Sequence, residues 1–158
     1  MSHPAADTEK SAYYLGEVDM AALIELIVNE NGIEWERFLA YTEKIEVEPG
    51  TVLIKQFDRD DRDIHILTEG ELEISVASET AGEEIALAKV NPIAVLGEQS
   101  FLDEGARSAT VSVRASSTVH RLTFAAFAGL CESAPDLGCA FLMDAAKSLS
   151  LSYRVHVD

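Results

Sequence analysis

The sequence predicts a mainly β fold, an antiparallel β-roll that resembles a jelly-roll barrel and has helices at both ends. The apolar residues recur with a helical period before residue 45, alternate with a period of two up to residue 123, and then return to a helical period. Turn residues interrupt the middle part about every 8–12 residues. With 158 residues, 47% of them hydrophobic, the chain is long enough for one domain with its own core.

The N-terminal part predicts a loose leader followed by two helices. The first ten residues are polar, without the apolar run of a secretory signal. Asp19 can cap a helix with one apolar stripe, which Asn31 and Gly32 end. A shorter helix follows, in which Phe38 and Leu39 lie close to helical spacing.

Eight short strands are predicted in the middle of the chain. Residues 71–76 alternate strictly between polar and apolar, which places the apolar side chains on the inner face of a sheet. The pairs at 49–50 and 69–70 have the composition of tight turns, and residues 58–62 that of a charged, solvated loop. The predicted strands are 45–48, 51–55, 64–67, 71–76, 84–90, 93–96, 110–113 and 119–122.

Two helices are predicted after the last strand. Thr123 can cap the first, from Phe124 to Glu132, and Pro135 suits the first turn of the second. Apolar residues recur every four positions along the second helix, at Leu137, Phe141, Ala145, Leu149 and Tyr153. The predicted boundaries are a flexible leader at 1–17, a single domain at 18–158, helices within 19–41, the β-roll at 45–123 and C-terminal helices at 124–156.

The charge of the chain disfavours partners that need clustered cations. The formal net charge is −16, which argues against duplex DNA and against an anionic membrane surface. Residues 105–158 carry 4 acids and 5 bases, so the acids are concentrated in the first 104 residues. An anionic ligand would therefore be repelled least by the last third of the chain.

The cysteines and apolar runs predict a cytoplasmic protein. Cys131 and Cys139 form no multi-cysteine framework, so free thiols in a reducing compartment are expected. No apolar run approaches the length of a membrane span.

The sequence disfavours a metal site. The histidines are scattered, which disfavours a metal site of cupin type, and arginines interrupt the acidic run at 58–63, which disfavours a calcium site. We expect His65 to be a half-buried strand residue and Gly70 a turn residue.

One stretch, from Leu96 to Val111, combines residues suited to hold a phosphate attached to a sugar. Gly97 allows close backbone approach, and a short helix opening at Glu98 would direct free N–H groups at an anion. The Glu98 carboxylate can accept a hydrogen bond from a sugar hydroxyl, and Arg107 supplies a permanent positive charge. The candidate ligand-binding residues are Gly97, Glu98, Gln99, Ser100, Arg107, Ser108 and Ala109.

This stretch resembles the phosphate-binding cassette of the cyclic nucleotide-binding domain family, the β-roll of catabolite activators and of cAMP-dependent kinase regulatory subunits. That cassette has a glycine and a glutamate, a short apolar helix, and an arginine followed by small residues and a valine. Gly97, Glu98 and residues 107–111 match it. Residues 49–53 resemble the family's entry to the roll, and residues 64–72 resemble its hairpin.

The resemblance, which extends from residue 46 to about residue 155, implies a regulatory sensor without enzymatic activity. The phosphate of cAMP or cGMP would bind to the cassette, and the C-terminal helix at 135–156 would move to cover the base. No other cofactor and no metal is implied. Because Asp158 ends the sequence without the DNA-binding domain of many bacterial relatives, we expect a protein partner of unknown identity to receive the signal.

Two details of the resemblance stay open. Ser108 fits a contact with the phosphate or with a guanine amino group, so the sequence does not choose between cAMP and cGMP. Leu149, Leu151 and Tyr153 fit the core, a base-capping face, or the seam of the homodimer that the family resemblance implies through the last helix.

The sequence departs from the family pattern in one segment and at three single residues. Residues 56–62 contain no glycine before the hairpin, and His65 stands where the family usually has a tyrosine. Gln99 replaces an aliphatic residue, and Ala106 stands where a proline often precedes the arginine. These departures can weaken ligand binding without abolishing it, because the glutamate and the arginine of the cassette are both kept.

Two functional hypotheses follow. The first is a cyclic nucleotide-binding regulatory domain that acts through a protein partner. The second is a ligand-free protein-interaction module with the same fold, which the acidic first two-thirds of the chain and the departures in the cassette favour. A structure in which Arg107 is paired with an internal carboxylate would strengthen the second hypothesis.

Overall fold

The computed structural model describes residues 32–78 and 82–157. The predicted leader at 1–17 and the predicted helix that starts at Asp19 lie outside these residues. Within them the chain runs from a helix into a set of strands, through one short helix between two strands, and back into helices. This is the order that the change of hydrophobic period predicts.

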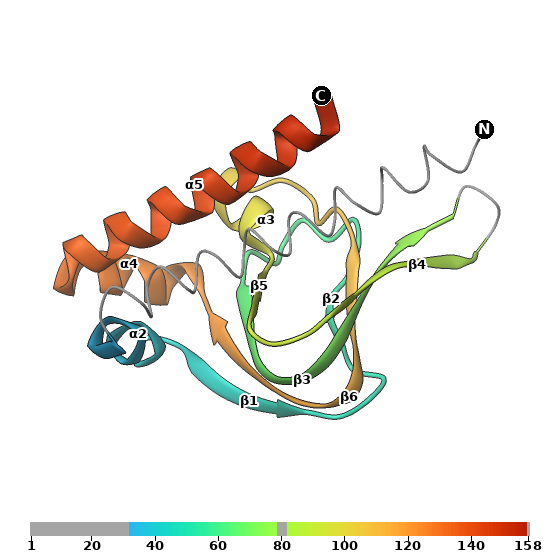
Figure 1. Cartoon of the computed structure of the whole chain (residues 1–158), viewed down its shortest axis with the longest axis horizontal. Helices are drawn as coiled ribbons and strands as arrows, with labels where there is room; N and C mark the ends of the chain where they lie inside the picture. Colours follow the sequence, from blue (N-terminus) through green and yellow to red (C-terminus); the bar gives the residue numbers. More distant parts are fainter. Residues whose placement is uncertain (1–31, 79–81, 158) are drawn as a thin grey trace.

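One antiparallel sheet of six strands curls into the roll over the described residues (Figure 1). The strands are β1 Glu43–Val47, β2 Val52–Ile54, β3 Ile64–Ala77, β4 Glu84–Val90, β5 Ala94–Leu96 and β6 Thr110–Leu122. The two long strands β3 and β6 pair with each other; β1 and β2 also pair with β6, and β4 and β5 with β3. The sheet is not closed, since no pairing among the described strands joins β1 to β4. The mainly β fold is therefore confirmed as an open roll.

Two pairs of predicted strands are in fact single bent strands, so the prediction of eight strands was wrong. β3 continues through Glu69 and Gly70, where we expected a tight turn, and β6 joins the two strands predicted at its ends. Gly70 has a φ of 107° and lies at a register irregularity between β3 and β6. A Cβ atom there would lie 2.0 Å from Oγ of Ser117. The glycine permits two bent strands to approach closely.

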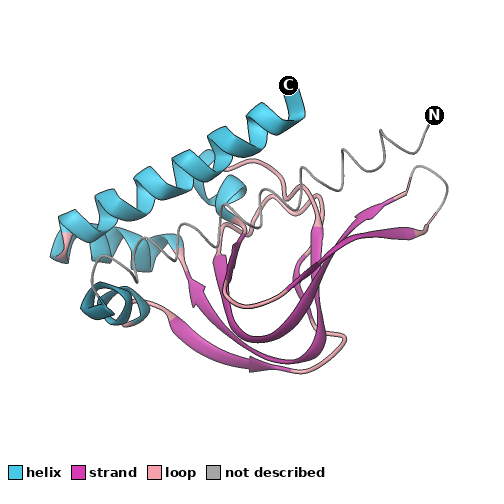
Figure 2. Cartoon of the chain, viewed as in Figure 1, coloured by secondary structure: helices cyan, strands magenta, loops and turns pink. Residues whose placement is uncertain are grey.

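The helices gather on one side of the roll (Figure 2). They are α2 Gly32–Leu39, α3 Glu98–Asp103, α4 Phe124–Ser133 and α5 Pro135–Val157. The predicted cap of α4 is confirmed, because the side-chain oxygen of Thr123 accepts a hydrogen bond from the backbone N–H of Ala126 at 3.1 Å. No described helix is both long enough and apolar enough to cross a membrane.

Aromatic side chains join α3 to the helices around it. The Phe101 ring of α3 lies 5.2 Å from that of Phe127 in α4 and 6.0 Å from that of Phe141 in α5, measured between centroids. Phe141 also stacks on Phe38 of α2. The predicted apolar stripe of α5 is buried at Leu137, Phe141 and Ala145. These contacts hold α3 in place at the end of the roll, beneath α5 (Figure 1).

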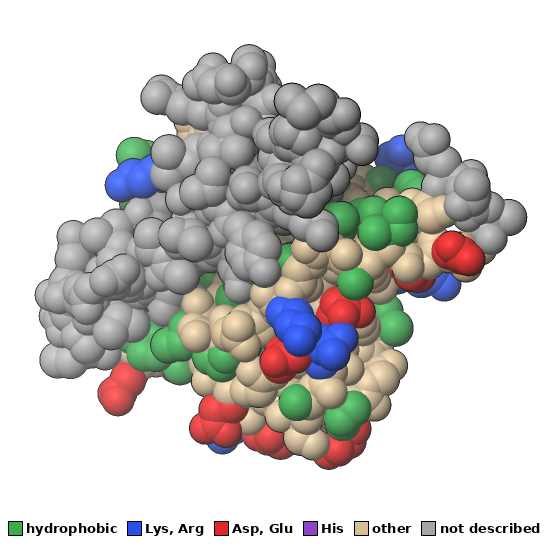
Figure 3. All heavy atoms as spheres, turned by 45° about the vertical axis from the view of Figure 1, so that its right-hand side comes forward, with side chains coloured by type: hydrophobic (Ala, Val, Ile, Leu, Met, Phe, Trp, Pro, Cys, Tyr) green, Lys and Arg blue, Asp and Glu red, His purple; other side chains and the backbone are tan. Residues whose placement is uncertain are grey.

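Charged side chains of both signs are mixed on the surface. On the face shown in Figure 3, basic side chains lie directly beside acidic ones. Among the exposed ion pairs, Arg114 of β6 pairs with Glu71 and Glu73 of β3. The interior of the roll is apolar. Its buried core consists of Val47, Ile54, Leu67, Leu72, Ile74, Val90, Ala94, Leu96, Val111, Val113 and Val119.

Candidate functional site

Gly97 makes the turn from β5 into α3, and the turn needs a glycine. Its φ is 93°, a left-handed conformation that is unfavourable for residues with a Cβ. A Cβ atom would lie 2.8 Å from both Nη1 of Arg107 and the backbone carbonyl oxygen of Asp63. The backbone of Gly97 therefore lies directly against the arginine that the sequence motif singles out.

Glu98, the first residue of α3, has a buried carboxyl group. The residue is 6% exposed, and burial raises the pKa of its carboxyl to about 7, opposed by a backbone hydrogen bond and by the charge of Arg107. Within the described residues, no group forms a hydrogen bond with Oε2 of Glu98. The site thus contains a buried oxygen atom that can accept a hydrogen bond from a hydroxyl donor.

Arg107 is buried between the cassette and the segment before β3. The residue is 3% exposed. Its Nη1 donates to the carbonyl oxygen of Gly97 at 3.0 Å, and its Nη2 donates to that of Asp63 at 2.7 Å. Nη2 also lies 2.9 Å from Oδ2 of Asp61. The guanidinium is therefore neutralised by a carboxylate of the same chain.

Backbone hydrogen bonds hold Arg107 to the same segment. Its N–H donates to the carbonyl oxygen of Asp58, and its carbonyl oxygen accepts from the N–H of Phe57, each at 2.8 Å. Phe57 is largely exposed and has a φ of 76°. The segment before β3 and the end of the cassette are thus paired through main chain as well as through the arginine side chain.

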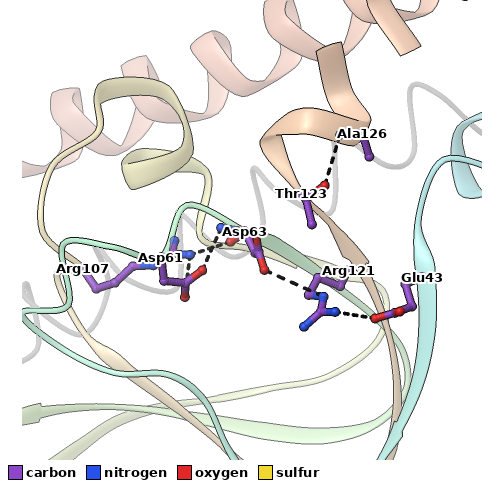
Figure 4. Close-up of polar contacts among 7 residues, drawn as sticks. All are labelled: Glu43, Asp61, Asp63, Arg107, Arg121, Thr123 and Ala126. Atoms are coloured by element: carbon purple, nitrogen blue, oxygen red, sulfur yellow. Dashed lines mark hydrogen bonds and ion pairs between the residues drawn. The ribbon is translucent and has the colours of Figure 1, made fainter. Parts of the chain in front are cut away.

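A chain of charged groups leads from Arg107 to the edge of the sheet (Figure 4). The carboxylate of Asp63 lies 3.8 Å from Nε of Arg121 in β6, and Nη2 of Arg121 donates to Glu43 of β1. Burial and the nearby charge of Asp61 raise the pKa of Asp63, and the two arginines oppose this effect. Asp61 and Asp63 therefore face different arginines.

His65 is more deeply buried than the sequence suggested, at 5% exposed. It lies in β3 opposite Leu96 of β5 and Arg121 of β6. Burial lowers the pKa of its imidazole to about 4, with Asp61 opposing the shift and the two arginines adding to it. Across the described part of the chain, its Nδ1 has no hydrogen-bond partner. His65 is therefore a buried, neutral residue beside Arg121 in the sheet.

The other candidate residues are divided between the interior and the surface. Ser100 is 2% exposed and faces inward, whereas Gln99 is exposed. Ser108 is exposed, and its carbonyl oxygen accepts a hydrogen bond from the Gln56 amide at 3.3 Å. Ala109 packs partly buried against the core of the roll. The structure therefore brings Gly97, Glu98 and Arg107 together but does not place Gln99 and Ser108 in the same buried group.

The predicted charged loop at 58–62 is a loop with Arg59 and Asp60 exposed, but Asp61 and Arg62 are half-buried and have partners within the fold. Asp61 pairs with the buried arginine, and the Arg62 guanidinium lies 3.8 Å above the ring centroid of Phe124. Arg62 also donates to the carbonyl oxygen of Phe101 at 2.6 Å. Sequence reasoning missed Asp61, because its arginine partner lies in a distant part of the chain and no local pattern marks the pair.

A comparison with models of known protein families identifies the family that the fold and the cassette indicate. Residues 44–134 match the cyclic nucleotide-binding domain. The chain belongs to this family. Members of this family are regulatory ligand-binding domains. The match confirms the predicted family, and the open antiparallel roll confirms the predicted fold. A search of curated proteins returned no match.

Solved structures of cyclic nucleotide-binding domains share the fold at low identity. The domain from Methylobacillus flagellatus has a TM-score of 0.70 and 20% identity, covering 91% of this chain and 80% of that one. The catabolite activator protein of Thermus thermophilus has a TM-score of 0.65 and 23% identity, and covers 75% of this chain. This chain spans about half of the Thermus protein, 55% of its length.

A third structure is a complex with ligand. The regulatory domain of Toxoplasma gondii PKA, solved with cAMP, has a TM-score of 0.57 and 23% identity, covering 71% of this chain and 43% of that one. At these identities the likeness shows the common fold alone.

Proposed function

We propose that this chain is a regulatory domain that binds a cyclic nucleotide, cAMP or cGMP. The observation that carries the proposal is the buried pair of Glu98 and Arg107 at the start of α3, which combines an acceptor for a hydroxyl with a cation for a phosphate. Membership of the cyclic nucleotide-binding domain family and the likeness to a structure solved with cAMP support it. We assign no catalytic step to the chain.

Each residue of the pair has a chemical role in this proposal. The ribose of a 3′,5′-cyclic nucleotide has one free hydroxyl, at the 2′ position, and Oε2 of Glu98 would accept its hydrogen bond. Arg107 would pair with the charged phosphate, and the Ala109 N–H and Ser108 hydroxyl would add donors. α5 would then move to cover the base and pass the signal to a protein partner, in the cytoplasm.

A second candidate function is a ligand-free interaction module with the same fold. The contact between Arg107 and Asp61 favours it, because the cation that would hold the phosphate is already paired with a carboxylate. The acidic residues in the first two-thirds of the sequence would then serve a protein partner directly. The two candidates differ in one measurable property, which is affinity for cyclic nucleotides.

Isothermal titration of the full chain with cAMP and with cGMP tests the first candidate. We expect saturable binding of one of them, with 5′-AMP as the control that lacks the cyclic phosphate. No heat and no thermal shift with either cyclic nucleotide at millimolar concentration would overturn it in favour of the second. The Arg107→Ala variant should bind far more weakly, because the phosphate loses its charged partner.

The role of Glu98 can be isolated by pairing a variant with a modified ligand. The wild-type chain should bind 2′-deoxy-cAMP about tenfold more weakly than cAMP, since a buried hydrogen bond is lost. The Glu98→Leu variant, whose side chain has no oxygen acceptor, should distinguish the two ligands much less. Equal discrimination by both proteins would show that Glu98 does not contact the ribose.

A further inference from the structure

We infer that Asp61 is an internal competitor for Arg107, so that an anionic ligand binds more tightly when the Asp61 carboxylate is displaced or neutralised. This inference rests on the proposed function and identifies a residue that controls the affinity of the same site for the nucleotide. Oδ2 of Asp61 lies 2.9 Å from Nη2 of Arg107, whose side chain is 2% exposed, whereas that of Asp61 is 23% exposed. Asp61 is thus the partly accessible member of a buried ion pair.

The partners of Arg107 differ in how easily they can leave. The carbonyl oxygen of Gly97 also accepts from Phe101 N–H within α3, and the carbonyl oxygen of Asp63 directly precedes β3. Both belong to a main chain that regular structure holds in place. The Asp61 carboxylate is a side chain in a turn, and rotation about its side-chain bonds can carry it into water.

A local turn stabilises the position of Asp61. Its Oδ1 accepts a hydrogen bond from the backbone N–H of Asp63 at 2.9 Å, while its Oδ2 faces Arg107. One carboxylate therefore bridges the turn and the guanidinium. The neighbouring Asp63 does not compete in the same way, because its carboxylate faces Arg121 and only its carbonyl oxygen contacts Arg107.

A phosphate and the Asp61 carboxylate are alternative partners for the same guanidinium. Both are anions that accept from its N–H groups, and placing both beside one buried cation sets two like charges in contact. Ligand binding would then be an exchange of one ion pair for another, with Asp61 released toward the exposed residues Arg59 and Asp60. The affinity for the nucleotide is lowered by the stability of the internal pair.

This exchange reconciles the two candidate functions. A chain with a strong internal pair is ligand-free at low nucleotide concentration and binds when the concentration overcomes the competition. The strength of the Asp61 contact would therefore decide the concentration range to which the domain responds. Asp61 becomes an affinity-determining residue that is not a ligand contact.

The Asp61→Asn variant tests the exchange. Asparagine has nearly the same shape and keeps an oxygen for the N–H of Asp63, but it lacks the negative charge. We expect it to bind cAMP or cGMP, whichever the wild type prefers, roughly tenfold more tightly, because the competing charge is removed. Asp60→Asn is the matched control, since it removes the same charge from an exposed side chain that has no ion pair with the arginine among the described residues. Its affinity should stay within about twofold of the wild type.

The outcomes separate this inference from the proposed function. Tighter binding by Asp61→Asn alone supports the exchange, most clearly if the wild type shows no binding and the variant does. Wild-type binding that Asp61→Asn leaves unchanged or weakens overturns the exchange and keeps the proposed function. Absence of binding in all three proteins overturns both. Asp61→Ser, which retains a side-chain oxygen acceptor for the turn, replaces the asparagine variant if the latter does not fold.

Discussion

Arg107 and Arg114 lie close together in the sequence, and each forms ion pairs with acidic residues, yet their surroundings differ. The Arg107 side chain is 2% exposed and uses both a carboxylate and backbone carbonyl oxygens as partners. The Arg114 side chain is 41% exposed and bridges Glu71 and Glu73 on the neighbouring strand β3. One arginine is part of the interior, and the other lies on the surface of the roll.

The comparison teaches that burial, more than the number of contacts, decides what an ion pair does here. Water solvates Arg114 and its partners almost as well when they are apart, so these ion pairs contribute little to the stability of the fold. Arg107 has lost its hydration, so its stability depends on its partners, which contact Nη1 and Nη2; its Nε has no hydrogen-bond partner among the described residues. Only the buried arginine can therefore discriminate strongly between a carboxylate and a phosphate as its partner.

The largest expected effect is the loss of stability on replacement of Arg107. Arg107→Met leaves the carbonyl oxygen of Asp63 without its side-chain donor, that of Gly97 with the Phe101 N–H alone, and Glu98 without a nearby cation, which should cost about 3–5 kcal/mol. Urea denaturation without ligand measures it. Arg107→Lys should recover part of this loss at most, because one ammonium cannot reach all partners of a planar guanidinium. A loss below about 1 kcal/mol for Arg107→Met would mean that the arginine is not structurally buried in solution.

The second expected effect is a pair of opposite pH dependences inside the same site. The pKa of Glu98 is raised from 4.5 to about 7, so the folded chain holds this proton more tightly and loses stability as the pH rises from about 4.5 to about 7. The pKa of His65 is lowered from 6.5 to about 4, so the folded chain gains stability as the pH rises from about 4 to about 6.5. The two contributions oppose each other in the wild type.

Single variants should separate these contributions. Relative to the wild type, Glu98→Gln should gain stability progressively from about pH 4.5 to about pH 7, by up to about 3 kcal/mol. His65→Asn should gain stability relative to the wild type as the pH falls from about 6.5 to about 4, by a similar amount. Chemical denaturation at a series of pH values measures both. Parallel pH profiles for the wild type and both variants would contradict the burial of these groups.

The third expected effect isolates the close contact at Gly97. Gly50 is the matched control, because it has the same φ of 93° and no described atom within 4 Å of an added Cβ. Gly50→Ala should cost about 1 kcal/mol for the backbone conformation alone. Gly97→Ala should cost about 2 kcal/mol more, because its Cβ also meets Arg107 and the main chain of Asp63. Equal losses, measured by thermal denaturation, would show that the site can relax around the new methyl group.

Much of the fold could be predicted from the sequence, because period and turn composition are local properties. The change to strict alternation located the roll, and Thr123 marked the start of α4 correctly. The continuity of β3 could not be predicted at Gly70, because a glycine permits a turn and a close approach equally well. The Ser117 side chain that decides between them belongs to a distant part of the chain.

The candidate site divides in the same way. The local motif brings Gly97 and Glu98 to the start of one short helix, and Arg107 lies against them as the spacing indicates. Their role in ligand binding stays a prediction. Asp61 could not be identified, since six neighbouring charges of both signs resemble a solvated loop until a partner from another segment is placed beside them.

The smallest expected effect completes the comparison of the two arginines. Arg114→Met removes the contacts with Glu71 and Glu73 but leaves no buried donor or acceptor unpaired, so the carboxylates remain hydrated. The loss of stability should be slight at low salt and should vanish at high salt, because salt screens exposed pairs. Arg107→Met should lose the same stability at both salt concentrations, since solvent ions do not reach its partners. Urea denaturation of both variants at the two concentrations measures the difference. A large, salt-independent loss for Arg114→Met would contradict the view that burial distinguishes these two arginines.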